Sequence, residues 1–297
     1  MFPWLAFGHI IPFLELAKLI AQRGHKISFI STPRNIQRLP SIPPNLTPRI
    51  NLSSSPDWII FDFAPYWLPE IATKLGISGV FFSIFGAWTI SFAGPSYSAM
   101  LTGDDPRTEP QHFTVPPKWV TFPSKVAFRI HEAKRFFDHI EVNSSGVSDS
   151  FRMGSVLAGC DVIAIRSCSE LEADFLRLVE DLHCKPVIPV RLLPPPAQFS
   201  EGGVDEKVFE EKKVGIEVPR DEQDGSFTRN SVAESLRLVI VDKEGSAYRE
   251  NAKQQMATLF GDETISDRCM DQFVAFLRSH RKLPAVIDND LPTHAPN

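Results

Sequence analysis

The chain has 297 residues, 43% of them hydrophobic, and a formal charge of −5 from 31 Lys and Arg against 36 Asp and Glu. That length and apolar share suit one large or two modest globular domains with an ordinary core. The negative charge disfavours binding to nucleic acid or to an anionic membrane surface, and the four cysteines show no metal-ligand spacing, so we expect reduced, mostly buried thiols.

The first 32 residues predict a strand, a tight loop, a helix and a second strand over residues 26–31. Pro12 suits the first turn of the helix, and Gly24 suits the position after its last turn. His9 falls in the loop. Ligands of parallel α/β sheets bind beyond the carboxyl ends of the strands, so His9 is expected to face a cleft. The apolar residues that recur at helical spacing are Phe13, Leu16, Ala17 and Ile20.

Residues 57–63 predict a buried strand that carries Asp62 at its carboxyl end, and a helix is expected over residues 64–75. The uncharged stretch over residues 75–103 is long enough to cross a membrane. Glycine, serine and proline interrupt it, however. A short strand over residues 80–84 followed by a helix is therefore favoured over a membrane span.

The rest of the chain predicts alternating helices and strands, then a proline-rich connection, then a mostly helical region. Before the connection we expect helices over 131–139, 148–157 and 170–182 and strands over 161–165 and 187–190. After it we expect a strand over 214–218 and helices over 230–241, 247–260 and 264–281.

Four segments carry a family resemblance in residue identity as well as in pattern: 1–32, with Phe7-Gly8-His9; 55–69; 159–172; and 211–228. Together they resemble the plant UDP-dependent glycosyltransferases of glycosyltransferase family 1. The nearest branch is the one that adds a sugar to an already glycosylated flavonoid or triterpenoid. The resemblance implies an α/β fold of GT-B type, with a Rossmann-like N-terminal domain built on a parallel sheet.

One long signature of that family is missing, because His-Cys-Gly-Trp occurs nowhere in the sequence. The resemblance therefore implies an acceptor-side domain over 1–190, a linker over 191–205, an incomplete and mostly helical donor-side remnant over 206–282, and a loose tail over 283–297. Donor-binding residues stay unassigned. The pair Gly202-Gly203 is a weak phosphate-binding candidate, and Asp288-Asn289-Asp290 is a weak metal-binding one.

The resemblance also implies a chemistry: inverting transfer of a sugar from a UDP-sugar to a hydroxyl of a flavonoid, a terpenoid or one of their glycosides. His9 matches the family's general base, and Asp62 matches the carboxylate that orients it. Phe85 and Trp88 are candidates for acceptor binding, although plain core packing explains them equally well. No metal and no cofactor beyond the UDP-sugar co-substrate are implied. We expect a cytoplasmic protein with no stable membrane insertion and no partner protein.

Several alternatives stay open. His9 could be a loop histidine bonded to a backbone carbonyl, and Asp62 could be the N-cap of the helix that follows it. The chain could be a catalytically inactive, truncated or alternatively spliced remnant that lacks donor binding. It could also be an unrelated α/β binding protein. Loss of internal segments further predicts exposed apolar surface and poor solubility.

Overall fold

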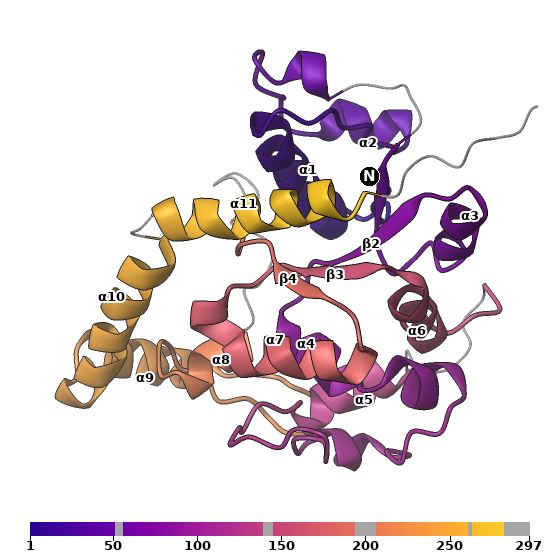
Figure 1. Ribbon diagram of the computed structural model, residues 1–297. Coiled ribbons are helices and arrows are strands. Elements are labelled where there is room, and N and C mark those ends of the chain that lie inside the picture. Colours follow the sequence, from indigo (N-terminus) through magenta and orange to yellow (C-terminus); the bar gives the residue numbers. More distant parts are fainter. Residues whose placement is uncertain (51–55, 139–144, 194–205, 261–262, 282–297) are drawn as a thin grey trace, which may run out of the picture.

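The computed structural model describes residues 1–50, 56–138, 145–193, 206–260 and 263–281. The glycine pair and the acidic triplet of the tail, like most of the expected linker, lie outside these residues. A four-stranded parallel sheet, shown in Figure 1, forms the centre in the order β1-β2-β3-β4. Its strands are β1 (Trp58–Phe61), β2 (Ser78–Ser83), β3 (Val162–Ile165) and β4 (Val187–Pro189). All four strands were predicted from apolar runs, with ends shifted by a few residues.

Short extended segments continue the sheet beyond β1. The backbone N–H of Phe2 donates to the carbonyl of Ile60 over 2.8 Å, and that of Ile30 donates to the carbonyl of Met1 over 3.0 Å. Isolated parallel bridges join Phe2 to Phe61 and Ile27 to Ile50, in place of the full strands expected in this region. Residues 1–2 therefore lie between β1 and the segment around Ile27. After residues 1–2 the chain first adds the segment around Ile27 on one lateral side of them, whereas β1 is added later on their other side. Such a reversal in the order of strands is typical of doubly wound parallel sheets.

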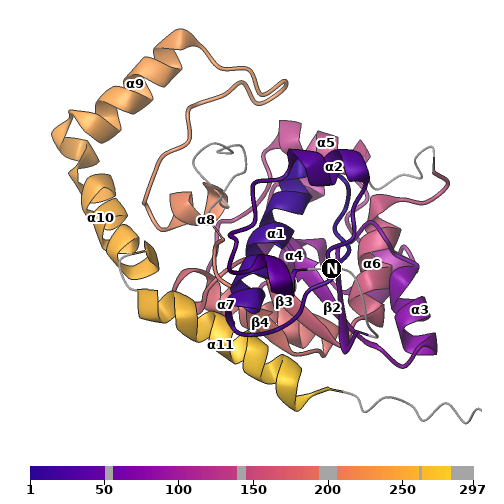
Figure 2. The same ribbon diagram turned by 90° about the horizontal axis from the view of Figure 1, so that it is seen from above.

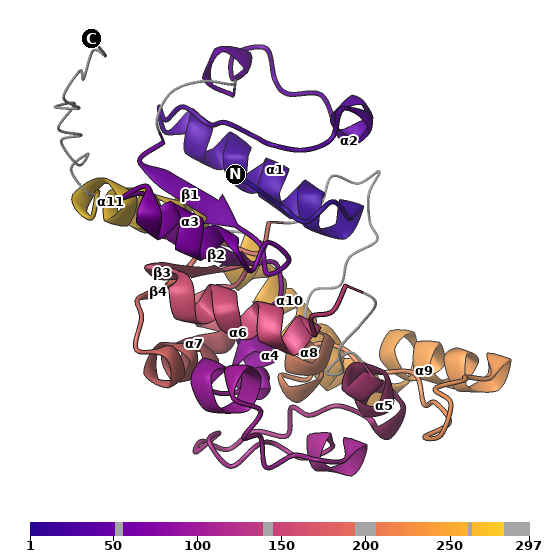
Figure 3. The ribbon, with the colours of Figure 1, turned by 90° about the vertical axis from the view of Figure 1, so that its right-hand side faces the viewer.

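The residues of each strand alternate between the two faces of the sheet, and helices cover both faces. One face packs on α1 (Phe7–Gln22) and α11 (Glu263–Ser279), as Figure 3 shows from the side. Its strand residues are Ile60, Val80, Phe82, Val162 and Ala164. The predicted helical stripe Phe13, Leu16, Ala17 and Ile20 is buried on this face.

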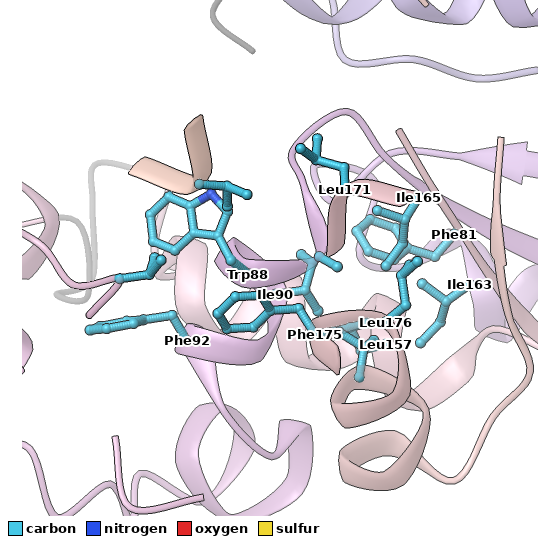
Figure 4. Packing of buried hydrophobic residues seen from close by; sticks show 14 of the residues in the cluster. Phe81, Trp88, Ile90, Phe92, Leu157, Ile163, Ile165, Leu171, Phe175 and Leu176 are labelled. Carbon is cyan, nitrogen blue, oxygen red and sulfur yellow. The ribbon is translucent and has the colours of Figure 1, made fainter. Parts of the chain in front are cut away.

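The opposite face packs on α4 (Ala87–Ala93), α6 (Asp149–Gly159) and α7 (Ser169–His183). Figure 4 shows the interlocked side chains, among them Phe81, Ile163 and Ile165 from the strands and Leu157 and Phe175 from the helices. The shorter elements are α2 (Pro33–Arg38), α3 (Leu68–Lys74), α5 (Ile130–Asp138), a π-helical turn (Ser96–Leu101) and 3₁₀ turns at Thr47–Arg49, Pro110–Phe113 and Lys243–Gly245.

Helix α1 begins earlier than predicted. Its first residue is Phe7, so Pro12 lies inside the helix instead of in its first turn, and His9 sits on the helix instead of in a loop. Because proline has no N–H, it leaves the carbonyl of Gly8 without its usual helical donor. Gly24 follows the helix with a φ of 92°, as its predicted place after the last turn requires.

After the predicted linker come α8 (Glu206–Glu211), α9 (Arg229–Ile240) and α10 (Ser246–Phe260). Helices α9, α10 and α11 confirm the three predicted helices, whereas α8 was not predicted. The predicted strand over 214–218 is wrong, since those residues form neither a strand nor a helix. Figure 2 shows α9 and the first part of α10 standing away from the body of the molecule, whereas Leu259, near the end of α10, is buried in its core.

Helix α11 returns to the body. Arg23, which follows α1 as its C-cap, pairs with Asp267 at 3.0 Å and with Asp271 at 2.6 Å, and the indole of Trp58 donates to the carbonyl of Leu277 over 2.9 Å. Helix α11, the last one within the described residues, thus covers the sheet. The domain division at residues 190 and 206 stays a prediction.

The uncharged stretch over 75–103 forms β2, α4 and the π-helical turn. None of the helices in the described ranges has the length and apolar character needed to span a bilayer. All four cysteines are free thiols. Cys160, Cys168 and Cys269 are buried, and Cys184 is exposed.

Candidate active site

The side chains of His9 and Asp62 meet at the carboxyl edge of the sheet. Asp62 directly follows β1, and His9 lies in the first turn of α1, which begins shortly after the segment that bridges β1. His9 Nδ1 lies 2.7 Å from Asp62 Oδ2, and the two residues are only 7% and 2% exposed. The contact forms at the point where the strand order reverses, and that is where doubly wound sheets bind their ligands.

Two backbone groups hold the Asp62 carboxylate in place. The N–H of Phe63 donates to Oδ1 over 2.7 Å, and the N–H of Trp4 donates to Oδ2 over 3.3 Å. Helix α3 begins at Leu68 and has Trp67 at its N-cap, so the N-cap reading of Asp62 is wrong. The reading of His9 as bonded to a backbone carbonyl is wrong as well, because its Nδ1 partner is a carboxylate.

The carboxylate also decides which ring nitrogen of His9 is available. An ionised carboxylate only accepts hydrogen bonds, so it assigns the proton of the neutral imidazole to Nδ1. Nε2 then keeps its lone pair. The pair can therefore take a proton from a bound hydroxyl, with the new positive charge resting against Asp62.

Among the described residues, three aromatic rings surround the imidazole. The ring centroids of Trp4, Phe63 and Phe85 lie 4.8, 5.8 and 6.1 Å from that of His9. Trp4 and Phe85 are 45% and 41% exposed, so each offers a free apolar surface beside the histidine. Phe85 was predicted as a site residue from the sequence, whereas Trp4 and Phe63 were not. Both nevertheless lie in the segments over 1–32 and 55–69 that contain His9 and Asp62.

Trp88, the other acceptor candidate, lies in the core. It is 6% exposed and packs on Phe128 at 5.5 Å and on Phe92 at 6.2 Å, as part of the cluster in Figure 4. Of its two proposed roles, the geometry supports packing.

Glu172 was given no role from the sequence, although it is the last residue of the segment over 159–172 that carries the family resemblance. Its carboxylate is 2% exposed and accepts from the N–H groups of Ala87 and Trp88, over 3.1 and 3.0 Å, and from the hydroxyl of Ser167. Burial raises the pKa of Glu172, and the hydrogen bonds oppose that rise. These bonds fix the start of α4, immediately after the loop that carries Phe85.

Within the described ranges, no three His, Cys, Asp or Glu side chains gather closely enough to hold a metal ion. The absence of a metal therefore stays a prediction for the whole chain, as does the absence of a cofactor.

Comparison with known proteins decides the family. UDP-glycosyltransferase 91A1 of Arabidopsis thaliana is 32% identical over 459 residues, which cover 95% of this chain and 96% of that protein. The chain belongs to the plant UDP-dependent glycosyltransferases. Soyasaponin III rhamnosyltransferase of Glycine max is a more distant relative, 25% identical over 95% of each chain. No family model matches the sequence.

Solved structures agree with the GT-B fold of this glycosyltransferase. A variant of Os79 from O. sativa in complex with UDP has a TM-score of 0.65 at 12% identity, covering 93% of this chain and 99% of the other. UGT71G1 of Medicago truncatula complexed with UDP-glucose has a TM-score of 0.62 at 11% identity, covering 93% and 97%. The four-stranded parallel sheet with helices on both faces is the part of that fold described above.

The same comparison shows that segments are missing from this glycosyltransferase. The alignment to the Arabidopsis relative runs over 459 residues, whereas this chain has 297, so the relative carries stretches with no counterpart here. Because the alignment nevertheless covers 96% of the relative, the stretches that this chain lacks lie inside the aligned region.

Proposed function

We propose that this chain transfers a sugar from a UDP-sugar to an acceptor hydroxyl, with His9 as the general base and Asp62 as its orienting carboxylate. The observation that carries the proposal is the 2.7 Å contact between His9 Nδ1 and Asp62 Oδ2 at the carboxyl edge of the sheet. Family membership supports the reaction class. Attack by a neutral hydroxyl is helped by a base that takes its proton, and the carboxylate holds His9 in place for that role.

In the proposed reaction the acceptor O–H bond breaks and its proton passes to His9 Nε2. The acceptor oxygen forms a bond to the anomeric carbon of the sugar as the bond from that carbon to the diphosphate breaks. The bonding electrons leave with UDP. Attack from the side opposite the leaving group inverts the anomeric configuration. Asp62 stabilises the imidazolium that forms.

We further propose a flavonoid, a terpenoid or one of their glycosides as the acceptor. The exposed rings of Trp4 and Phe85 beside His9 suit a flat or apolar molecule, which they would contact through their faces. The relative named as a soyasaponin rhamnosyltransferase adds weak support for the terpenoid class. The cytoplasmic location stays a prediction.

A second candidate function is that of an inactive remnant that binds an acceptor and transfers nothing. The observation that favours it is the set of missing segments, together with the absence of His-Cys-Gly-Trp from the sequence. Positioning of the sugar nucleotide and stabilisation of the departing diphosphate contribute much of the rate in such reactions. A chain without the groups that supply them would bind an acceptor but form no product.

Calorimetric titration with UDP and UDP-glucose, followed by an assay of UDP release with a flavonoid acceptor, separates the two functions. Binding in the micromolar range, with turnover that the His9→Ala variant abolishes, supports the transferase. Acceptor binding without detectable heat from either nucleotide supports the remnant. Turnover that survives in His9→Ala would refute the assignment of the base.

A further inference from the structure

Trp4 contacts both members of the His9–Asp62 pair. Its backbone N–H donates to Asp62 Oδ2 over 3.3 Å, the same oxygen that meets His9 Nδ1. Its indole ring lies 4.8 Å from the imidazole at an interplanar angle of 80°, which is an edge-to-face contact. No other ring contact of His9 in the described residues is as short.

Such contacts restrict how the imidazole can turn. The second side-chain torsion of histidine is broad and roughly two-fold, so a hydrogen bond from one nitrogen alone leaves the ring considerable freedom. An edge-to-face contact has a preferred geometry, so it favours one setting of the ring. Trp4 is itself supported by Phe63, whose ring lies 5.6 Å away at 73°.

We propose that Trp4 is a positioning residue of this site: its ring keeps Nδ1 of His9 on Asp62, and its backbone N–H keeps Asp62 in place. Nε2 is then the nitrogen left to meet an acceptor hydroxyl. Only this last step rests on the proposed function, since the orientation of the ring is a property of the unliganded protein.

Substitution separates the two contacts, because a change of side chain keeps the backbone donor. Trp4→Ala removes the ring alone, and Trp4→Phe restores an aromatic ring. Trp4→Leu keeps much of the bulk without the aromatic geometry, and replaces Trp4→Ala if that variant fails to fold. The chain offers a matched control in Trp67, which is 44% exposed against 45% for Trp4 and packs edge-on against Phe2 instead of His9.

The test is nitrogen NMR of the full chain labelled at its histidines, with His9→Gln used to assign the His9 signals. The wild type and Trp67→Ala should show one His9 tautomer, protonated at Nδ1 and with a proton signal protected from exchange with water. Trp4→Ala and Trp4→Leu should lose that signal and show averaged nitrogen shifts, and Trp4→Phe should regain the wild-type spectrum. An unchanged His9 spectrum in a folded Trp4→Ala or Trp4→Leu protein would overturn the proposal.

An activity arm extends the test. If the chain turns over, Trp4→Ala should lower kcat by about tenfold and change KM less, because misplacing a catalytic group by an ångström costs up to about a hundredfold. A wild type that shows the expected tautomer but no turnover would count against the proposed function and leave the positioning role supported.

Discussion

The carboxylate of Glu172 accepts a 3.0 Å hydrogen bond from the backbone N–H of Trp88, and so joins α7 to the first turn of α4. To reach it, Glu172 departs from helical geometry within α7, with φ −134° and ψ 37°. The adjoining N–H of Ala87 and the hydroxyl of Ser167 donate to the same carboxylate. One buried acceptor thus satisfies three donors and sets where the loop bearing Phe85 ends.

Glu172→Gln should destabilise the fold. An amide has only one acceptor oxygen, and its NH₂ group would face backbone donors, so at least one buried N–H loses its partner. Leaving such a group unsatisfied costs about 1–3 kcal/mol. Chemical denaturation at pH 7 measures the change. Glu180→Gln on the same helix is exposed and should stay within about 0.5 kcal/mol of the wild type. Equal stabilities of the two variants would show that the Glu172 hydrogen bonds contribute little.

Asp62→Asn should lower turnover by about a thousandfold or more, as the equivalent change does in the histidine-aspartate pair of serine proteases. An amide NH₂ facing His9 Nδ1 favours the tautomer protonated at Nε2, which cannot accept the hydroxyl proton. UDP-release kinetics and the NMR tautomer both report the change. Asp57→Asn is the control, because Asp57 precedes the same strand but pairs with Arg281 at the surface. Wild-type turnover and tautomer in Asp62→Asn would exclude an orienting role for Asp62.

The pairing of His9 with Asp62 could be anticipated because each follows a parallel-strand segment, and parallel carboxyl ends share one edge of a sheet. The position at which α1 begins could not be anticipated. Gly8 and Pro12 both read as signals against a helix interior, yet the packing of residues 10–21 on the sheet overrides those local preferences. His9 consequently lies on a helix turn, where its contact with Trp4 depends on side-chain directions that sequence spacing does not specify.

The C-terminal region shows a different limit. Residues 214–218 have the composition of a strand, but a strand exists only when paired, and within the described residues no extended segment pairs with them. The sequence predicted the helix that forms α11. It did not say that this helix would cover α1 and β4, because a helical pattern does not identify the partner on which a helix packs.

His183 should make stability depend on pH. Burial, with a smaller contribution from Lys185, lowers the pKa of His183 from 6.5 to about 4. As the pH falls, the unfolded chain therefore takes up a proton on His183 near pH 6.5, whereas the folded protein takes it up only near pH 4. The stabilisation is full above pH 6.5, and on the order of 3 kcal/mol is lost as the pH falls to 4.

Denaturation curves between pH 7 and 4 test this dependence. His183→Leu should flatten that part of the curve, because neither ring nitrogen of His183 has a hydrogen-bond partner among the described residues and removing them orphans nothing. The exposed His280→Asn variant should keep the wild-type slope. The assignment fails if His183→Leu and the wild type lose stability in parallel.

Helices α9 and α10 should make the protein associate with itself. Their exposed apolar side chains are Leu236, Ile240 and Met256, at 51%, 65% and 66% exposure, with Val241 adjoining at 70%. A groove of about 320 Å³ opens beside them, between α9, α10 and residues 214–218. Relatives carry segments that this chain lacks, so apolar surface without a cover is expected, and in a pure sample a second copy is the available partner.

Sedimentation velocity should show the average mass rising with concentration. A double change of Ile240 and Val241 to Glu should suppress the rise, whereas Val115→Glu, at a comparably exposed site elsewhere on the molecule, should not. A wild type that remains monomeric at every concentration would mean that this apolar surface is too small or too dispersed to drive association.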